Sequence, residues 1–185
     1  MLQKAYAGII LAAMALTGAQ AQAEGLHLTS PDITEGATLK TEQVFAGFGC
    51  TGGNISPELH WSGAPAGTKS FALTAYDPDA PTGSGWWHWV VYDLPATATG
   101  LPKGVGTAQW TLPGGGNQSR TDFGVTGYGG PCPPAGDKPH HYLFTLYALD
   151  VPTLGVDSNG SAALVGFNLH FHTLAKTTLT GLYSR

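Results

Sequence analysis

The sequence is poor in positive charge. Its 185 residues contain 8 Lys and Arg against 12 Asp and Glu, which gives a formal net charge of −4. Surfaces that bind nucleic acids gather Lys and Arg into a patch or stripe that meets the phosphates. No such stripe is visible, so the composition argues against a nucleic-acid partner.

Long apolar runs are also scarce. The only candidate follows Lys4 near the N-terminus and has about twelve residues, whereas a membrane-spanning helix needs roughly twenty. The small residues of Ala19–Ala23 fit a cleavage site, and no lipoprotein-type cysteine follows. We therefore favour a secretory signal peptide over residues 1–23 rather than a membrane anchor. Residues 24–185 are then one exported domain, and the expected location is the periplasm.

Cysteine is limited to Cys50 and Cys132, and both lie in glycine-rich segments. In an exported chain, two cysteines favour a disulfide over a metal site or a catalytic thiol. The sequence therefore predicts a bond between Cys50 and Cys132.

Glycine and proline are abundant, with 27 and 13 residues. Together with short runs of β-type residues, they favour an all-β domain with long functional loops. The strands that we expect are residues 26–30, 41–45, 56–62, 70–77, 87–94, 140–149 and 176–183.

One segment, Ser161–Ala175, has helical periodicity. Its apolar residues lie three and four apart and form one stripe. This stripe consists of Leu164, Phe167, Phe171 and Leu174. His170 and His172, near the helix end, are expected at the surface.

The segment 77–94 concentrates polar and aromatic residues in a strand–loop–strand unit. Asp77 ends one expected strand, Pro78 and Pro81 terminate it, and His88 begins the next. An antiparallel pair would bring Asp77 and His88 together and create a polar pocket at the end of a sheet. Simple alternation places Trp86, His88 and Val90 on one face and Trp87, Trp89 and Val91 on the other.

A second segment, residues 127–142, is a glycine- and proline-rich loop that leads into a strand. Alternation places His140 and Tyr142 on one face of this strand and His141 on the other, where a surface role is expected. Asp79 is expected to brace its own turn.

These segments carry a family resemblance. DPDAP at 77–81, WWHW at 86–89 and GPCPPAGDKPHHY at 130–142 resemble the phosphatidylethanolamine-binding protein family. GFGCTGGNISPELHW at 47–61 is similar to its bacterial Raf-kinase-inhibitor-like branch. The resemblance runs from about Leu26 to the C-terminus. It implies a single-domain β-sandwich of two antiparallel sheets with Greek-key connections and a few peripheral helices.

The resemblance also implies a small pocket that binds phosphate or phosphoryl groups. Imidazole and phenol groups can donate to phosphate oxygens, and free N–H groups of a glycine loop can form an anion-binding nest. Asp77 would orient an imidazole, and Cys132 stands where many relatives have glycine. The implied ligand-binding residues are Asp77, His88, Pro133, Pro134, His140 and Tyr142. The alternative is a buried polar cluster that only fixes the loops.

Three functions compete. The first is a non-enzymatic periplasmic binding protein that uses no metal or cofactor. Such a protein would act like a kinase or protease inhibitor, or would modulate an interaction with a host. The second is a metal-dependent hydrolase that uses Asp77, His88 and His140, since catalytic zinc takes three protein ligands. Against hydrolases, the sequence has neither HExxH nor GxSxG. The third is an interaction protein whose exposed edge or apolar patch forms a homodimer or contacts a host or envelope protein.

Overall fold

The fold is described by a computed structural model that covers residues 25–107, 112, 114–157 and 159–185. The predicted signal peptide, residues 1–23, lies outside this part of the chain. The described residues form ten strands and one helix: β1 (His27–Thr29), β2 (Ala46–Gly47), β3 (Cys50–Thr51), β4 (Leu59–Ser62), β5 (Ser70–Asp77), β6 (Trp86–Pro95), β7 (Gly100–Leu101), β8 (Asn117–Gln118), β9 (His140–Leu149), α1 (Ala162–His172) and β10 (Thr173–Tyr183).

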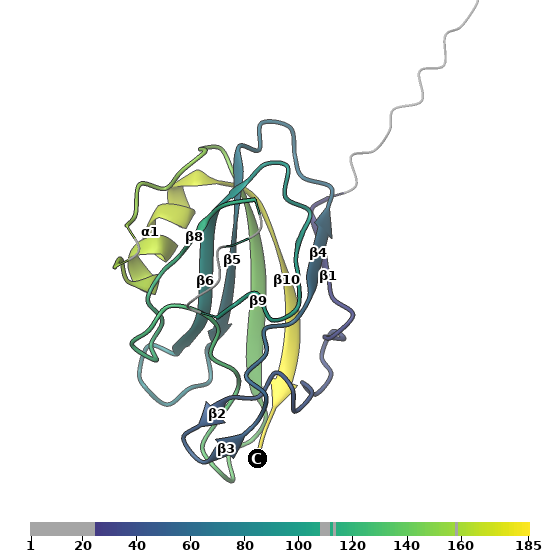
Figure 1. The fold of residues 1–185 in the computed structure, drawn as a ribbon, viewed down its shortest axis with the longest axis vertical. Helices are drawn as coiled ribbons and strands as arrows, with labels where there is room; N and C mark the ends of the chain where they lie inside the picture. The colour runs from purple at the N-terminus through teal and green to yellow at the C-terminus, as the bar shows by residue number, and fades with distance from the viewer. Residues whose placement is uncertain (1–24, 108–111, 113, 158) are drawn as a thin grey trace, which may run out of the picture.

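The long strands build a five-stranded antiparallel sheet in the order β10-β9-β5-β6-β8 (Figure 1). A three-stranded sheet has the order β1-β4-β7, and β2 and β3 form a small hairpin. Side chains from both larger sheets join in one core cluster, which includes Trp61 and Leu101 from the small sheet and Phe71, Trp89 and Phe144 from the large one. The two sheets therefore bury these apolar side chains against each other, away from water.

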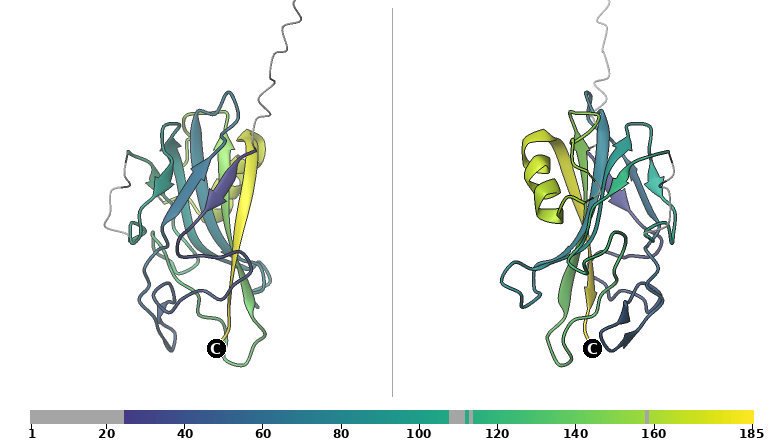
Figure 2. Two further views of the ribbon diagram at one scale, coloured as in Figure 1. Left: turned by 90° about the vertical axis from the view of Figure 1, so that its right-hand side faces the viewer. Right: turned by 60° about the vertical axis from the view of Figure 1, so that its left-hand side comes forward.

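The helix α1 lies on the outside of the five-stranded sheet (Figure 2). It begins at Ser161, whose hydroxyl accepts a hydrogen bond from the Leu164 N–H. This is the usual role of serine before the first helical turn. Ala162, Val165 and Leu169 face the sheet and form a second apolar cluster with residues such as Val90 and Tyr92.

The apolar stripe expected on this helix faces solvent instead. Leu164, Phe167, Phe171 and Leu174 are 47%, 62%, 62% and 45% exposed. The helix is apolar on both sides, so its periodicity could not identify the buried one. It also ends at His172, three residues before the expected boundary, because Thr173–Ala175 already belong to β10.

A bulge at His88 changes the expected face pattern of β6. Ala75 pairs with Trp89 and Tyr76 pairs with Trp87, so His88 has no partner on β5. A bulge of this kind turns two successive side chains to one side. Trp87 therefore joins the cluster under α1, while Trp89 joins the core between the sheets. The prediction that Trp87 and Trp89 share a face was wrong.

The mainly β class is confirmed, and β5 and β9 have the predicted bounds. The sandwich geometry and Greek-key connections stay predictions.

Thr41–Phe45 was wrongly predicted as a strand: it forms turns in which the Gln43 and Val44 N–H groups bond to nearby carbonyls. The described part of the chain has one α-helix rather than a few. In that part, no helix is long and apolar enough to cross a membrane.

Candidate functional site

A cavity of about 220 Å³ lies where β5 ends, β6 begins and β9 begins. All six residues that the sequence predicted for the ligand site line it. The remaining lining residues are Phe48, Ala80, Pro81, Thr82, Trp86, Phe123 and Cys132. The family motifs thus contain every residue of the cavity lining except Thr82 and Phe123.

Asp77 holds this end of the sheet together. Its Oδ2 lies 2.8 Å from Nδ1 of His140, and both side chains are buried. Its Oδ1 accepts hydrogen bonds from the backbone N–H groups of Asp79 and Ala80, at 2.8 and 3.1 Å. The carboxylate therefore orients the imidazole, as expected, and also fixes the turn after β5.

Asp79 has a different role from the one predicted. Its carboxylate does not brace its own turn but accepts from the backbone N–H and the Nδ1 of His141, at 2.8 and 2.7 Å. These hydrogen bonds lower the pKa of Asp79. The side chain of His141 is half exposed, in agreement with its predicted place on the outer face.

His140 is held between two carboxylates. Burial by itself would lower its pKa, but the hydrogen bond and the charge of Asp77 outweigh burial, so the pKa is raised. Its Nε2 lies 3.4 Å from the carboxylate of Asp137, which is a long contact with a partly exposed side chain. His140 is therefore easier to protonate than a free histidine, and its Nε2 is only weakly engaged.

His88 differs from His140 because its pKa is lowered rather than raised. Its Nδ1 lies 2.7 Å from the carbonyl oxygen of Gly129, so this nitrogen carries the hydrogen. Burial lowers the pKa of His88 to about 4 and outweighs the hydrogen bond to Gly129. At neutral pH the ring is uncharged and its Nε2 is an acceptor. The hypothesis that His88 donates to a phosphate therefore needs revision.

The hydroxyl of Tyr142 is buried and has no hydrogen-bond partner among the described residues. Burial and the nearby charge of Asp77 raise the pKa of Tyr142, so the phenol keeps its proton and can donate. Its ring meets His88 edge to face at 5.1 Å. A buried donor without a partner costs about 1–3 kcal/mol, which is why such a group in a cavity indicates a ligand or water.

The glycine loop does not supply the expected nest. The Gly129 N–H donates to the His88 carbonyl, and the Gly130 N–H donates to the side chain of Asn54. Pro131, Pro133 and Pro134 have no N–H to offer. The candidate donors for an anion are therefore side chains rather than the backbone N–H groups of these glycines.

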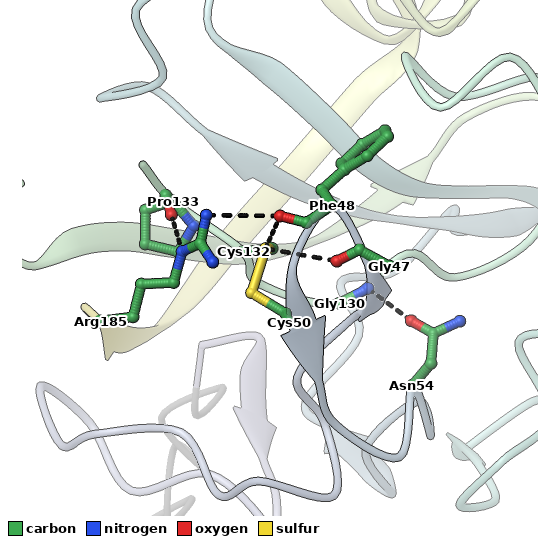
Figure 3. Close-up of a disulfide and its surroundings, with 8 residues drawn as sticks. All are labelled: Gly47, Phe48, Cys50, Asn54, Gly130, Cys132, Pro133 and Arg185. Carbon is green, nitrogen blue, oxygen red and sulfur yellow. Dashed lines mark hydrogen bonds between the residues drawn. A yellow bond between two sulfur atoms is a disulfide. The ribbon is translucent and has the colours of Figure 1, made fainter. Parts of the chain in front are cut away.

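The predicted disulfide is present: the sulfur atoms of Cys50 and Cys132 are 2.10 Å apart. Beside it, Arg185 donates through Nε to the Pro133 carbonyl at 2.7 Å and through Nη2 to the Phe48 carbonyl at 3.3 Å (Figure 3). The C-terminal residue and the disulfide thus connect the two loops that form one side of the cavity.

Aromatic rings surround the cavity entrance. Phe123 stacks with Phe48 at 5.9 Å and meets Trp86 edge to face at 5.4 Å, and Phe48 is 68% exposed. Neither phenylalanine was predicted as a site residue. Phe48 lies inside the motif at 47–61, whereas no local pattern links Phe123 to the motifs. Asp137 was not predicted either, although its position three residues before His140 was a usable signal.

The geometry does not favour a metal site. Both carboxylate oxygens of Asp77 are already hydrogen-bonded, and Nδ1 of His88 points to a carbonyl. Within the part of the chain that the structure describes, no three His, Cys, Asp or Glu residues are arranged to hold a metal ion. The alternative of a hydrolase built on Asp77, His88 and His140 thus lacks a suitable ligand set.

Solved structures agree with the fold. The crystal structure of Escherichia coli YbcL, described as a new member of the mammalian PEBP family, has a TM-score of 0.86 and 55% identity. It covers 88% of this chain and 99% of YbcL. A homologue of this family from Chlamydia trachomatis, CT736, has a TM-score of 0.72 and 32% identity over 87% of this chain and 98% of that one.

Sequence comparison gives the same assignment. This chain is 53% identical to UPF0098 protein YbcL of Escherichia coli K12 over 95% of this chain and 96% of YbcL. Identity to UPF0098 protein YbhB of the same organism is also 53%, over 86% of this chain and all of YbhB. The profile of the phosphatidylethanolamine-binding protein family matches residues 29–184. The chain therefore belongs to the phosphatidylethanolamine-binding protein family.

Proposed function

We propose that this protein is a non-enzymatic binding protein whose cavity takes a phosphate or phosphoryl group. The observation that carries the proposal is the unpaired hydroxyl of Tyr142, a buried donor in the same cavity as His140, whose pKa is raised by Asp77. A phosphoryl oxygen would accept from the hydroxyl and would also approach the weakly engaged Nε2 of His140.

The uncharged state of His88 restricts which ionisation state of the phosphoryl group can bind. A fully ionised phosphoryl group has only acceptors and cannot pair with the free Nε2 of His88. A singly protonated phosphoryl group has one P–OH, which would donate to this nitrogen. The proposed ligand form is therefore the monoanion.

The aromatic entrance indicates what carries the phosphoryl group. Phe48, Phe123 and Trp86 offer ring faces and edges next to the cavity. Burial of an apolar or aromatic carrier against these rings stabilises the complex beyond the polar contacts. A phosphate monoester with an apolar substituent should accordingly bind more tightly than inorganic phosphate.

We also propose that the protein acts in the periplasm. The disulfide between Cys50 and Cys132 supports this location, because such bonds persist in oxidising compartments. The predicted signal peptide over residues 1–23 is consistent with export. Protease protection in intact and osmotically shocked cells tests the location: protein that stays protected after osmotic shock would contradict it.

Calorimetry with inorganic phosphate and phenyl phosphate tests the site. Tyr142→Phe removes only the unpaired hydroxyl and keeps the ring. We expect it to weaken binding by about 10-fold or more, because a hydrogen bond to a charged group contributes about 1.5–3 kcal/mol. The melting temperature should stay equal or rise slightly. Unchanged affinity in Tyr142→Phe would contradict the proposed site.

Tyr147→Phe is a matched control. Tyr147 lies on the same strand, β9, outside the cavity lining, so removal of its hydroxyl should leave phosphate affinity unchanged. If neither ligand binds the unmodified protein, the phosphoryl hypothesis is wrong and the cavity has another occupant.

A further inference from the structure

The small hairpin of β2 and β3 turns at Phe48 and Gly49. Gly47 pairs with Cys50 across the turn, so Phe48 and Gly49 form a two-residue connection. Their φ angles are 51° and 84°, both positive. Two successive positive φ angles are the feature of a type I′ turn, in which asparagine followed by glycine is a favoured pair. Gly49 thus suits its position, whereas Phe48 does not.

A positive φ angle at phenylalanine is a strained conformation. The left-handed region brings Cβ close to a carbonyl oxygen, and bulky residues rarely adopt it. Such strain persists where the surrounding contacts impose it, and it concentrates at ligand sites. Burial does not compensate for it here, because Phe48 is 68% exposed. The fold alone therefore gives no reason for a large apolar residue at this position.

Three contacts fix the turn at the entrance of the cavity. The Phe48 carbonyl oxygen accepts a hydrogen bond from Nη2 of Arg185 at 3.3 Å, and Nε of Arg185 donates to the Pro133 carbonyl at 2.7 Å. Two residues after Phe48, Cys50 is bonded to Cys132. The turn is thereby tied to a loop that lines the cavity, while the ring of Phe48 points away from Arg185 (Figure 3).

The ring of Phe48 belongs to a group of aromatic rings at the rim of the cavity. It lies 5.9 Å from Phe123, with an angle of 14° between the ring planes, and 5.2 Å from Phe45. Of the three aromatic rings at the rim that line the cavity, Phe48, Phe123 and Trp86, Phe48 is the most exposed. An aromatic ring of a ligand can pack on its exposed part in the offset or edge-to-face arrangement that aromatic pairs prefer.

The polar groups of the cavity are buried, in contrast to this rim. Four of them are 2–4% exposed: Asp77, His88, His140 and Tyr142. A ligand reaches these groups past the exposed rim. When its phosphoryl group is bound at Tyr142 and His140, a substituent on that group therefore lies along the path to Phe48.

We propose that Phe48 is a specificity-determining residue, whose ring the strained turn holds at the rim so that an aromatic substituent of a phosphate monoester stacks on it. The inference rests on the proposed phosphoryl site and adds what that site selects, namely aromatic monoesters over aliphatic monoesters of the same size. Strain and exposure at Phe48 both destabilise the free protein, and a ligand ring covers the exposed surface. Residues that serve a ligand at the expense of stability commonly combine these features.

A purely structural role for Phe48 makes a different prediction. If its ring only stabilised the hairpin, Phe48→Asn would lower the melting temperature and leave binding unchanged. In the proposed role the same variant relieves the strain, because asparagine is favoured at this turn position. We then expect an equal or higher melting temperature together with weaker binding of an aromatic ligand.

Calorimetry with inorganic phosphate, phenyl phosphate and cyclohexyl phosphate measures the selection. At about pH 5, below the second phosphate pKa of about 6, all three ligands are mainly monoanions. The unmodified protein should bind phenyl phosphate about 2-fold to 10-fold more tightly than cyclohexyl phosphate, which is the added contribution of one aromatic pair. Phe48→Leu keeps an apolar side chain and should lose this preference.

Phe48→Asn should also lose the preference and should bind phenyl phosphate about 10-fold less tightly, because apolar contact is lost as well. Both variants should bind inorganic phosphate as the unmodified protein does. Phe167→Asn is the matched control: Phe167 is 62% exposed, lies on α1 and is outside the cavity lining. The same substitution at Phe167 should change the affinity for none of the three ligands.

Equal affinities of the unmodified protein for phenyl and cyclohexyl phosphate would overturn the inference. A preference that survives in Phe48→Leu and Phe48→Asn would also overturn it, since the selection would then lie elsewhere. Either result leaves the phosphoryl site in place as long as inorganic phosphate binds and Tyr142→Phe weakens that binding. A protein that binds none of the three ligands contradicts both the inference and the proposed function, so the two failures can be told apart.

Discussion

Asp77 and His140 form a buried carboxylate–imidazole hydrogen bond across the end of the large sheet, with Oδ2 and Nδ1 2.8 Å apart. The pair joins β5 to β9 and aims one histidine at the cavity while the same carboxylate holds the turn after β5. Asp77 thereby contributes both to the stability of this sheet end and to the raised pKa of His140.

The raised pKa of His140 makes the contribution of this pair depend on pH. The stabilisation is fully present below the ordinary histidine pKa of about 6.5 and is lost as the pH rises through the raised value. Asp77→Asn keeps an acceptor for the Asp79 and Ala80 N–H groups but removes the charge. We expect it to lower the free energy of unfolding by about 3–5 kcal/mol.

Urea unfolding between about pH 6 and about pH 9 measures this effect. The unmodified protein should lose stability toward alkaline pH, and Asp77→Asn should show a flatter profile. An equal pH dependence in both proteins would mean that His140 is not the group responsible.

His88 should cause the opposite dependence in acid. Its pKa is lowered to about 4, so its contribution to stability is present above pH 6.5 and is lost as the pH falls toward 4. The difference from the ordinary value corresponds to about 3 kcal/mol. His88→Asn keeps a donor for the Gly129 carbonyl but does not titrate. In urea unfolding, the acid loss should shrink in this variant, whatever its absolute stability.

The disulfide should stabilise both the fold and the entrance of the cavity. Cys50 and Cys132 are 82 residues apart, and closure of a loop of this length contributes roughly 4–5 kcal/mol through the entropy of the unfolded chain. Replacement of both cysteines by alanine should lower the melting temperature and weaken phenyl phosphate binding. Dithiothreitol should reproduce this effect in the unmodified protein and have none in the variant. An unaltered affinity would show that the Phe48 and Pro133 loops do not need the covalent link.

Much of the fold could be predicted because several strands carry clear patterns. Ser70–Asp77 and His140–Leu149 are bounded by proline or glycine segments and rich in aromatic and aliphatic residues, so even their ends were right. Thr41–Phe45 has similar residues, but the surrounding loops impose turns on it. Tertiary contacts there override the local preference.

Side-chain direction was harder to predict. One extra residue at His88 reverses the alternation of part of β6, and no composition rule marks where such a bulge falls. Which face of α1 is exposed could not be predicted for a related reason. Both sides of the helix are apolar, so the choice depends on the sheet that covers one of them.

The polar part of the site could be predicted because the motifs place Asp77, His88, His140 and Tyr142 at strand ends. What the motifs could not show was the use of each group. The Gly129 N–H donates to the His88 carbonyl, and two rings of the aromatic wall, Phe48 and Phe123, are far in sequence from Asp77 and His140. These features arise from loop packing, which leaves no periodic signal.

The last prediction concerns Asp137, whose carboxylate lies 3.4 Å from Nε2 of His140. In the proposed complex a phosphoryl oxygen approaches this same nitrogen, so the carboxylate and the anion compete for it and repel each other. Asp137 is partly exposed, and a charge at such a site contributes about 0.2–1 kcal/mol. Asp137→Asn should therefore strengthen phosphate binding by about 2-fold to 5-fold, whereas Asp77→Asn should weaken it because the charge on His140 is no longer supported. In the unmodified protein and in Asp137→Asn, the affinity for phosphate should fall as the pH rises through the pKa of His140. Calorimetry at several pH values separates these effects, with Asp150→Asn as a control on a carboxylate next to the opposite end of β9 and outside the cavity lining. Weaker binding in Asp137→Asn would show that Asp137 positions His140 for the ligand instead of competing with it.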